Sequence, residues 1–328
     1  MMHKATTALG IGLVGVGRHG SRYVQHLLHD LPGAALAAVC RRTVGEPLPG
    51  YEIPVFGDYR AMIADPRVQA VVVVTPPSLC HDICLAAVRA GKPILIEKPL
   101  ATTGTEARAM VGAADQAGVL LMTAQTLRFD PAILLLKEQV RTIGPLQSAV
   151  LTSHIETKAN VLPGSAAPVP LGALLELGVH LLDLVRFLTG EEIVEVRSMM
   201  APMPSSAPEI EAKVELRTAG GVSCVLDIAR VESRRVGTAE WVGTAGCVIA
   251  DWPQRKVTRI TASGRSDEWT VDPRPTVLAT LEAFVRAIRT GMPPPVTGLD
   301  GCRAVEAADA CYRSAAQGGT IVSLVSNG

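Results

Sequence analysis

Three ionisable side chains recur along one short apolar segment in the middle of the chain. Glu176, His180 and Asp183 lie within the sequence ALLELGVHLLDLVRFL, residues 173–188. At about 100° per residue, a helix brings the three within an arc of roughly 60°. The rest of that helix is apolar apart from Arg186, so we expect it to be buried with its polar stripe facing a cleft. Because histidine exchanges protons near neutral pH, His180 is a candidate acid–base catalyst; a stripe that faces bulk water is the alternative.

A glycine-patterned turn near the start of the chain has the spacing of a phosphate-binding loop. Gly15–Gly20 reads G-x-G-x-x-G, after an apolar run at Leu9–Val14 and before helical spacing at Ser21–His29. The first glycine makes a tight turn, the second lets the backbone approach a pyrophosphate, and the third permits close helix–strand packing. The N–H groups at the helix start hold the anion. Unless the turn is purely structural, the residues expected to bind a dinucleotide are Gly15, Gly17, Arg18, His19 and Gly20.

The residues after the second expected strand, Ala34–Cys40, bear on which dinucleotide binds. In an NAD site an acid roughly 20 residues beyond the glycine turn hydrogen-bonds the ribose. Here Arg41 and Arg42 follow the strand, and the nearest acid is Glu46. Guanidinium groups suit bidentate contacts to a 2′-phosphate. The sequence therefore favours NADP over NAD, with NAD binding and solvated arginines as the alternative.

A lysine follows another apolar run of the first half. Ile94–Ile96 leads into Glu97-Lys98-Pro99. Ligands of an open parallel sheet bind beyond the carboxyl ends of its strands. This position puts Lys98 where a nicotinamide and its substrate would meet, although a strand-terminal lysine in solvent is the simpler interpretation of the tripeptide by itself.

The first 124 residues alternate between short apolar runs and segments of helical spacing. Runs buried on both faces and separated by helices predict a parallel, doubly wound sheet. We therefore assign residues 1–124 to an NAD(P)-binding Rossmann domain. The expected strands are Leu9–Val14, Ala34–Cys40, Ala70–Val74, Ile94–Ile96 and Val119–Thr123, and the expected helices are Ser21–His29, Tyr59–Ala64, His81–Ala90 and Thr105–Ala117.

Residues 125–328 have longer extended segments joined by glycine turns. Gly220-Gly221 and Gly243–Gly246 predict hairpins. This second domain is expected to be α+β, with a mixed or antiparallel sheet and a few helices. The expected strands are Gln147–Thr157, Ile193–Met200, Ile210–Arg217, Val222–Val231 and the hairpin Ala239–Ala250, and the expected helices are Pro131–Arg141, Ala173–Leu188, Thr276–Thr290 and Gly301–Ala316.

Composition excludes several classes of protein. With 31 Lys+Arg, 31 Asp+Glu and a formal net charge of zero, the chain has no overall attraction to nucleic acid or to an anionic membrane. Its 3 Trp, 4 Tyr and 4 Phe are too few for the stacking platforms of a single-strand binder. No apolar stretch approaches the roughly 20 residues of a membrane helix. Seven sparse cysteines predict structural thiols in a reducing compartment, so we expect a cytoplasmic protein without a metal site.

The order of several short motifs resembles that of the Gfo/Idh/MocA oxidoreductases, the family of glucose–fructose oxidoreductase and inositol dehydrogenase. Each motif is modest by itself, but together they follow the family's order at near-family spacing over almost the whole chain. The matching pieces are Gly15–Gly20, Thr75-Pro76-Pro77, Ala90-Gly91-Lys92 leading into Glu97-Lys98-Pro99, Arg128-Phe129-Asp130-Pro131 and Leu177–Asp183.

The resemblance implies a Rossmann domain followed by a substrate-binding α+β domain with a large, mostly antiparallel sheet. Family members commonly associate through the open face of that sheet, which implies a homo-oligomer, a dimer or a tetramer. Thr75, Pro76 and Glu97 would contact the cofactor, and Lys98 would lie beside the nicotinamide and the substrate oxygen.

Further roles are implied on the segment that carries His180, which matches the family's catalytic histidine. Glu176 stands where the family usually has an aspartate, and it would orient the histidine or a substrate hydroxyl. Asp183 matches the family's second acid and would either contact the substrate or support a residue that does. Together with Arg128 and Lys158 it is a candidate substrate contact.

Two other features affect the substrate rather than the fold. Cys80 stands where the family often has a histidine, and His81 follows one residue later. His154, Glu156 and Lys158 alternate along an expected strand and so share one face. That face either lines a polar substrate pocket or is a solvated or subunit-facing surface.

These observations lead to an NAD(P)-dependent oxidoreductase that transfers a hydride between the nicotinamide and a secondary alcohol or its carbonyl, in a sugar, polyol or derivative. Lys98, His180 and Glu176 are the predicted catalytic residues. One alternative is a cofactor-dependent lyase or glycosidase with no net redox change. Another is a cofactor-binding regulatory protein without turnover. The fold cannot separate them, since function resides in the site.

Overall fold

The computed structural model describes residues 8–43, 48, 50–156, 171–201, 208–231 and 233–324. The chain forms two compact units, of which unit 1 comprises residues 1–126 and 275–302 and unit 2 comprises residues 127–274 and 303–328. The first boundary lies two residues beyond the predicted one. The structure also differs from the predicted division in that residues 275–302 return to the first unit.

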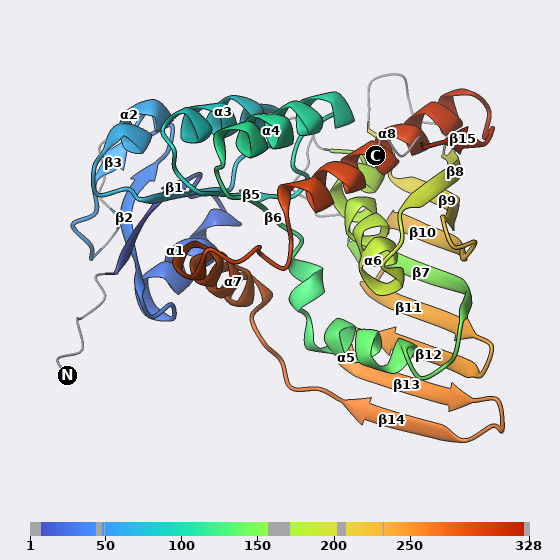
Figure 1. Cartoon of the computed structure of the whole chain (residues 1–328). Helices are drawn as coiled ribbons and strands as arrows, with labels where there is room; N and C mark the ends of the chain where they lie inside the picture. Colours follow the sequence, from blue (N-terminus) through green and yellow to red (C-terminus); the bar gives the residue numbers. More distant parts are fainter. Residues whose placement is uncertain are drawn as a thin grey trace. The chain divides into compact units, whose positions relative to one another are not determined.

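Unit 1 is a parallel sheet covered by helices on both faces, as predicted. Its six strands run in the order β3-β2-β1-β4-β5-β6, and every adjacent pair is parallel. Helices α2, α3 and α4 cover one face and α1 and α7 the other (Figure 1). The strands are β1 Leu9–Val14, β2 Ala34–Cys40, β3 Val55–Phe56, β4 Ala70–Val73, β5 Ile94–Glu97 and β6 Leu121–Ala124, and the helices are α1 Gly20–His29, α2 Tyr59–Ala64, η1 Pro77–Leu79, α3 Cys80–Arg89, α4 Gly104–Ala117 and α7 Thr276–Thr290.

Local sequence explains where these helices begin and end. The Thr103 side chain accepts a hydrogen bond from the Glu106 backbone N–H at the start of α4, which satisfies one of the donors that a helix start leaves open. The same helix ends at Gly118, whose φ of +62° is left-handed and favours glycine.

Unit 2 is a nine-stranded sheet in the order β14-β13-β12-β11-β7-β10-β9-β8-β15. Its pairs are antiparallel except for β7 with β10, so the expectation of a mostly antiparallel sheet is confirmed. The strands are β7 Leu146–Glu156, β8 Ile193–Met200, β9 Glu211–Thr218, β10 Ser223–Val231, β11 Val236–Gly243, β12 Gly246–Asp251, β13 Lys256–Thr261, β14 Ser266–Thr270 and β15 Val322–Ser323, and the helices are η2 Thr126–Phe129, α5 Pro131–Val140, η3 Leu174–Gly178 and α6 Val179–Thr189. Helix α8, Gly298–Ala316, begins in unit 1 and belongs to unit 2 from Arg303 onward.

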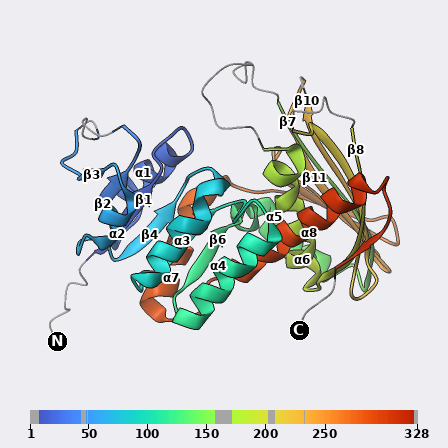
Figure 2. The same cartoon turned by 90° about the horizontal axis from the view of Figure 1, so that it is seen from above.

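The core of unit 2 lies on one face of this sheet. Helices α5 and α6 and the later part of α8 pack against that face (Figures 1 and 2). Side chains alternate along each strand, so that in β9 Val214 and Leu216 are buried whereas Lys213 and Glu215 are exposed. Strands β13 and β14 extend the sheet beyond the strands that the sequence predicted.

Candidate functional site

The glycine turn lies between β1 and α1, and close backbone contacts require glycine at Gly15 and Gly20. Gly15 has a φ of +94°, and a Cβ there would lie 2.1 Å from the Val74 carbonyl oxygen. A Cβ on Gly20 would lie 2.1 Å from the Gly15 carbonyl oxygen. A Cβ on Gly17 would meet nothing within 4 Å, so its backbone faces open space. A tight turn with one bare, open backbone segment at a helix start fits a pyrophosphate.

The other predicted cofactor residues lie at the carboxyl ends of neighbouring strands in unit 1. Thr75 and Pro76 follow β4, which pairs with both β1 and β5. Arg41 and Arg42 follow β2; Arg41 is half-buried and Arg42 is exposed. Strand β1 lies between β2 and β4, where the strand order reverses, and this is where dinucleotides bind in doubly wound sheets.

Glu97 is the buried acid at the end of β5, and its carboxylate accepts three hydrogen bonds. Oε1 lies 2.6 Å from the Tyr23 hydroxyl and 2.6 Å from Nε2 of His19. Oε2 accepts the backbone N–H of Lys98 at 3.0 Å. A buried carboxylate is tolerated when its oxygens are satisfied in this way. The structure therefore joins the glycine turn, through His19, to the strand end that carries Lys98.

Cys80 begins α3 and is fully buried. Its Sγ lies 3.7 Å from Thr75 Oγ1 and 3.8 Å from the Pro76 carbonyl oxygen. Burial is the main reason that the pKa of this thiol is raised to about 12, and burial likewise raises the pKa of Cys84 to about 12. Both remain neutral thiols at physiological pH, and within the described ranges no group of three or more His, Cys, Asp or Glu could hold a metal ion.

The segment that carries Glu176 and His180 begins with a π-helical turn, η3, before continuing as α6, where the sequence predicted a single α-helix. Such turns occur frequently at functional sites. Both side chains are half-buried. The Glu176 carboxylate forms an ion pair with Arg230 of β10, and Arg230 also donates to the Leu171 carbonyl oxygen at 2.7 Å.

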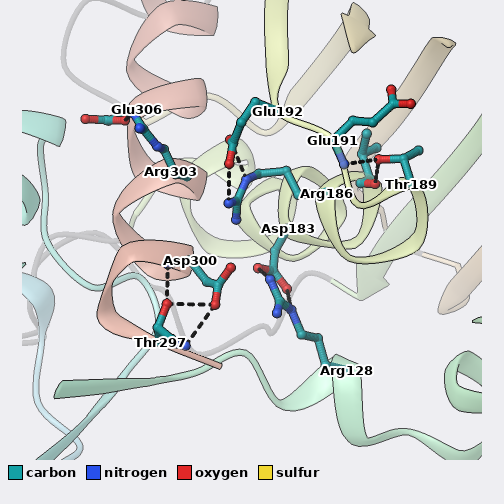
Figure 3. A network of polar contacts seen from close by, with 11 residues as sticks. Arg128, Asp183, Arg186, Thr189, Glu191, Glu192, Thr297, Asp300, Arg303 and Glu306 are labelled. Atoms are coloured by element: carbon teal, nitrogen blue, oxygen red, sulfur yellow. Dashed lines mark hydrogen bonds and ion pairs between the residues drawn. The ribbon is translucent and has the colours of Figure 1, made fainter. Parts of the chain in front are cut away.

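Asp183 and Arg128, predicted as substrate contacts, bind each other instead of lining an open face. Arg128 donates from Nε to Asp183 Oδ2 at 2.7 Å and from Nη2 to Asp183 Oδ1 at 2.6 Å. Figure 3 shows the two side chains meeting. Their side chains are only 8% and 2% exposed. The Arg128 guanidinium also lies 5.0 Å from the ring centre of Phe187. This geometry favours a positioning role for the pair, and substrate contact stays an untested prediction.

The predicted polar strip on β7 lies on the sheet face opposite the helices. His154 Nε2 is 3.1 Å from Asp227 Oδ1, which also accepts from Lys213 Nζ at 2.6 Å. Glu156 accepts from the Arg235 backbone N–H. Lys158 lies outside the described residues. The geometry therefore favours the solvated or subunit-facing surface over a pocket.

The sequence analysis missed two residues that contact candidate site residues. Tyr23 reaches Glu97 from α1, and Arg230 reaches Glu176 from β10. In a helix that follows the glycine turn, a tyrosine three residues after the last glycine faces the sheet. This spacing could have identified Tyr23 from the sequence. Arg230 had no comparable local signal, because its contact depends on how β10 packs against η3.

Comparison with known proteins gives the same picture over nearly the whole length. Residues 9–125 match the family described as oxidoreductase family, NAD-binding Rossmann fold, and residues 162–249 match the GFO/IDH/MocA C-terminal domain. Inositol 2-dehydrogenase 2 of Saccharopolyspora erythraea is 31% identical over 95% of this chain and 94% of its own length. The scyllo-inositol 2-dehydrogenase (NAD(+)) of Bacillus subtilis is 26% identical over 88% of each chain.

Solved structures agree with these sequence matches. The aldose-aldose oxidoreductase of Caulobacter crescentus, solved with glycerol, has a TM-score of 0.84 and 26% identity over 97% of this chain and 100% of that one. No helix among the described residues is long and apolar enough to cross a membrane. The chain belongs to the Gfo/Idh/MocA family of oxidoreductases, and its first unit has the family's NAD-binding Rossmann fold.

Proposed function

We propose that this chain is a dehydrogenase or reductase that moves a hydride between a nicotinamide and a secondary alcohol or its carbonyl, in a sugar, a polyol or a derivative. The observation that carries the proposal is the position of Lys98. It directly follows β5, at the same edge of the sheet as the glycine turn after β1, with only β4 between the two strands. The names of the inositol dehydrogenases among its relatives support a polyol as the substrate class.

Each proposed catalytic group has one task in the oxidative direction. His180 accepts the proton of the substrate hydroxyl. The ammonium group of Lys98 stabilises the substrate oxygen as negative charge develops on it. Glu176, held by Arg230, orients His180 or a neighbouring hydroxyl. A bound nicotinamide supplies the hydride acceptor, and Gly15, Gly17, Arg18, His19, Gly20, Thr75 and Pro76 would hold the dinucleotide.

The choice between the two dinucleotides is a finer proposal. We propose NADP as the preferred form, because Arg42 is exposed directly beyond β2 and a guanidinium suits a 2′-phosphate. NAD is the alternative, and the name of the Bacillus subtilis relative specifies NAD(+). Tighter binding of NADPH than of NADH, lost in Arg42→Ala, would support NADP. Tighter binding of NADH would make Arg42 a surface charge and leave the oxidoreductase proposal intact.

The test of function combines cofactor binding with turnover of a polyol. The fluorescence of NADH and NADPH gives Kd, and reduction of NAD(P)+ by myo-inositol and a panel of aldoses gives kcat. Lys98→Met should lower kcat by about 100-fold or more and change the Kd of the reduced cofactor by less than about threefold. Lys256→Met is the matched control, because this exposed lysine forms a surface pair with Glu268. Unchanged turnover in Lys98→Met would contradict its role, and a wild-type chain that binds neither cofactor would contradict the function.

We also propose a homo-oligomer formed through the face of the unit 2 sheet that its helices leave uncovered. The exposed Val150 and Val225, directly paired in the register of β7 and β10, support this. A cytoplasmic location is a further proposal. It is supported by the seven cysteines, all of which are free thiols.

A further inference from the structure

We propose that His19 and Tyr23 are positioning residues for Lys98, acting through the carboxylate of Glu97. This inference rests on the proposed function, in which Lys98 acts on the substrate oxygen. It assigns His19 a second task beyond cofactor contact. The glycine turn and the catalytic lysine then form one hydrogen-bonded unit, although 78 positions separate His19 from Glu97 in the chain.

The Glu97 carboxylate is the centre of this unit. It is buried, with its side chain 7% exposed, so it needs donors on both oxygens. Oε1 accepts hydrogen bonds from the His19 imidazole and the Tyr23 hydroxyl, and Oε2 accepts one from the backbone N–H of Lys98. Whatever fixes this carboxylate therefore fixes the backbone from which the Lys98 side chain departs.

His19 is oriented for this contact rather than for capping its helix. It occupies the N-cap position of α1 but makes no side-chain capping bond there. Its Nε2 lies 2.6 Å from Glu97, and its ring meets that of Tyr23 edge to face at 5.7 Å between centroids. Glu97 accepts this bond from the tautomer of His19 that carries its proton on Nε2.

Tyr23 gives the carboxylate a donor that does not titrate in the working range. The side chain is fully buried. Burial, followed by the charge of Glu97 and the hydrogen bond to it, holds the pKa of the phenol well above its usual value of 10.0. The hydroxyl therefore keeps its proton near neutral pH and donates a hydrogen bond to Glu97.

The proposal differs measurably from a role for His19 in cofactor binding alone. A residue that only contacts the dinucleotide changes its Kd and leaves kcat at saturating cofactor unaltered. A residue that positions Lys98 loosens the Lys98 backbone N–H even with no cofactor present. The rate of hydrogen exchange of the Lys98 amide measures this loosening directly.

The experiment compares His19→Leu, which removes the donor, with His19→Gln, whose side-chain N–H sits the same number of bonds from Cβ. In His19→Leu the Lys98 amide should exchange about tenfold faster, the loss expected for one hydrogen bond to a charged group. The kcat at saturating cofactor should fall about tenfold as well, and loss of the cofactor contact of His19 appears separately, as a higher Kd of NADH. His19→Gln should restore both the exchange rate and kcat to within about threefold of the wild type. The matched control is His26→Gln, since His26 on the same helix pairs with Asp30 instead.

Tyr23→Phe keeps the ring and removes the hydroxyl, so it tests the same carboxylate by a second route. It should also accelerate exchange of the Lys98 amide. Because both donors share Oε1, the double variant should deviate from additivity. Unchanged Lys98 exchange in both single variants, or a His19→Leu defect confined to the Kd of NADH, would overturn the proposal. The exchange measurement needs neither cofactor nor substrate, so failure of the proposed function would appear separately, as a wild-type chain without NADH binding or turnover.

Discussion

Because several thiols are buried, we expect the free energy of unfolding of this protein to fall at alkaline pH. Burial is the main cause that raises the pKa to about 12 for Cys80, Cys84, Cys224 and Cys311, whereas a thiol in the unfolded chain ionises near 8.5. The folded-state pKa is the higher one. These thiols therefore contribute their full stability below about pH 8.5, and that contribution is lost as the pH rises toward 12.

We expect the free energy of unfolding, from urea titrations, to fall between pH 9 and 11 by about 1.4 kcal/mol per pH unit for each such cysteine. Replacing Cys84 and Cys224 with serine should reduce the slope by about two of these contributions. The range between pH 6 and 8 serves as the internal control, because the thiols ionise in neither state there. An identical alkaline slope in the variant would show that these thiols do not keep their protons in the folded state.

Local motifs in the sequence identify candidate site residues, whereas contacts between residues far apart in the chain leave no such motif. The glycine turn and the end of β5 each occupy consecutive positions, so spacing along the chain fixes spacing in the fold. Tyr23 and Arg230 reach their carboxylates across 74 and 54 positions. Such contacts depend on how a helix packs against a sheet, which one sequence does not encode in any local pattern.

At the scale of elements, the helix that carries His180 differs from its prediction in one instructive way. Apolar periodicity predicted an α-helix over 173–188, and it places Asp183 beside Glu176 and His180. The π-helical turn η3 changes the angular spacing of Glu176 from the two later residues, whereas His180 and Asp183 both lie within α6. Asp183 is then 1% exposed and pairs with Arg128, because an apolar helix face admits a carboxylate only with a partner.

Breaking this pair should destabilise unit 2 rather than weaken substrate binding alone. Asp183→Asn leaves the Arg128 guanidinium buried beside a neutral group, which costs about 3–5 kcal/mol of unfolding free energy. The double variant Arg128→Met with Asp183→Leu should recover most of that loss. Urea unfolding of the three proteins measures it.

The same helix provides the control for this prediction. Arg186 and Glu192 form a similar bidentate pair (Figure 3), but the Glu192 side chain is 40% exposed. Glu192→Gln should therefore cost less than about 1 kcal/mol. If Asp183→Asn kept full stability and only raised KM, the pair would be a substrate contact, as the sequence first indicated.

At the scale of the whole molecule, the sequence predicted two domains and their fold classes but not the path of the chain. The alternation of apolar runs with helical segments predicted the parallel sheet of the first domain. Longer extended segments joined by glycine turns predicted the mostly antiparallel sheet of the second domain. Helix α7 was predicted at the right residues, yet it belongs to unit 1. Its apolar stripe indicates a buried face without indicating which sheet covers it, since any sheet of matching shape can do so.

The uncovered face of the unit 2 sheet carries the last prediction, which concerns self-association. Val150, Val225 and Met199 are 49%, 44% and 61% exposed, and they lie on strands whose opposite side chains form the core. Val150 and Val225 lie side by side, and contiguous exposed apolar surface is typical of interfaces, so we expect the protein to be a dimer or tetramer by light scattering. Val225→Asp, paired across the register with Val150, should shift it toward monomer because two copies would bury a carboxylate without a partner. Leu134→Asp is the control, since this residue of α5 is 42% exposed but lies on the helical side. A wild-type monomer, or equal dissociation by both substitutions, would contradict an interface on this face.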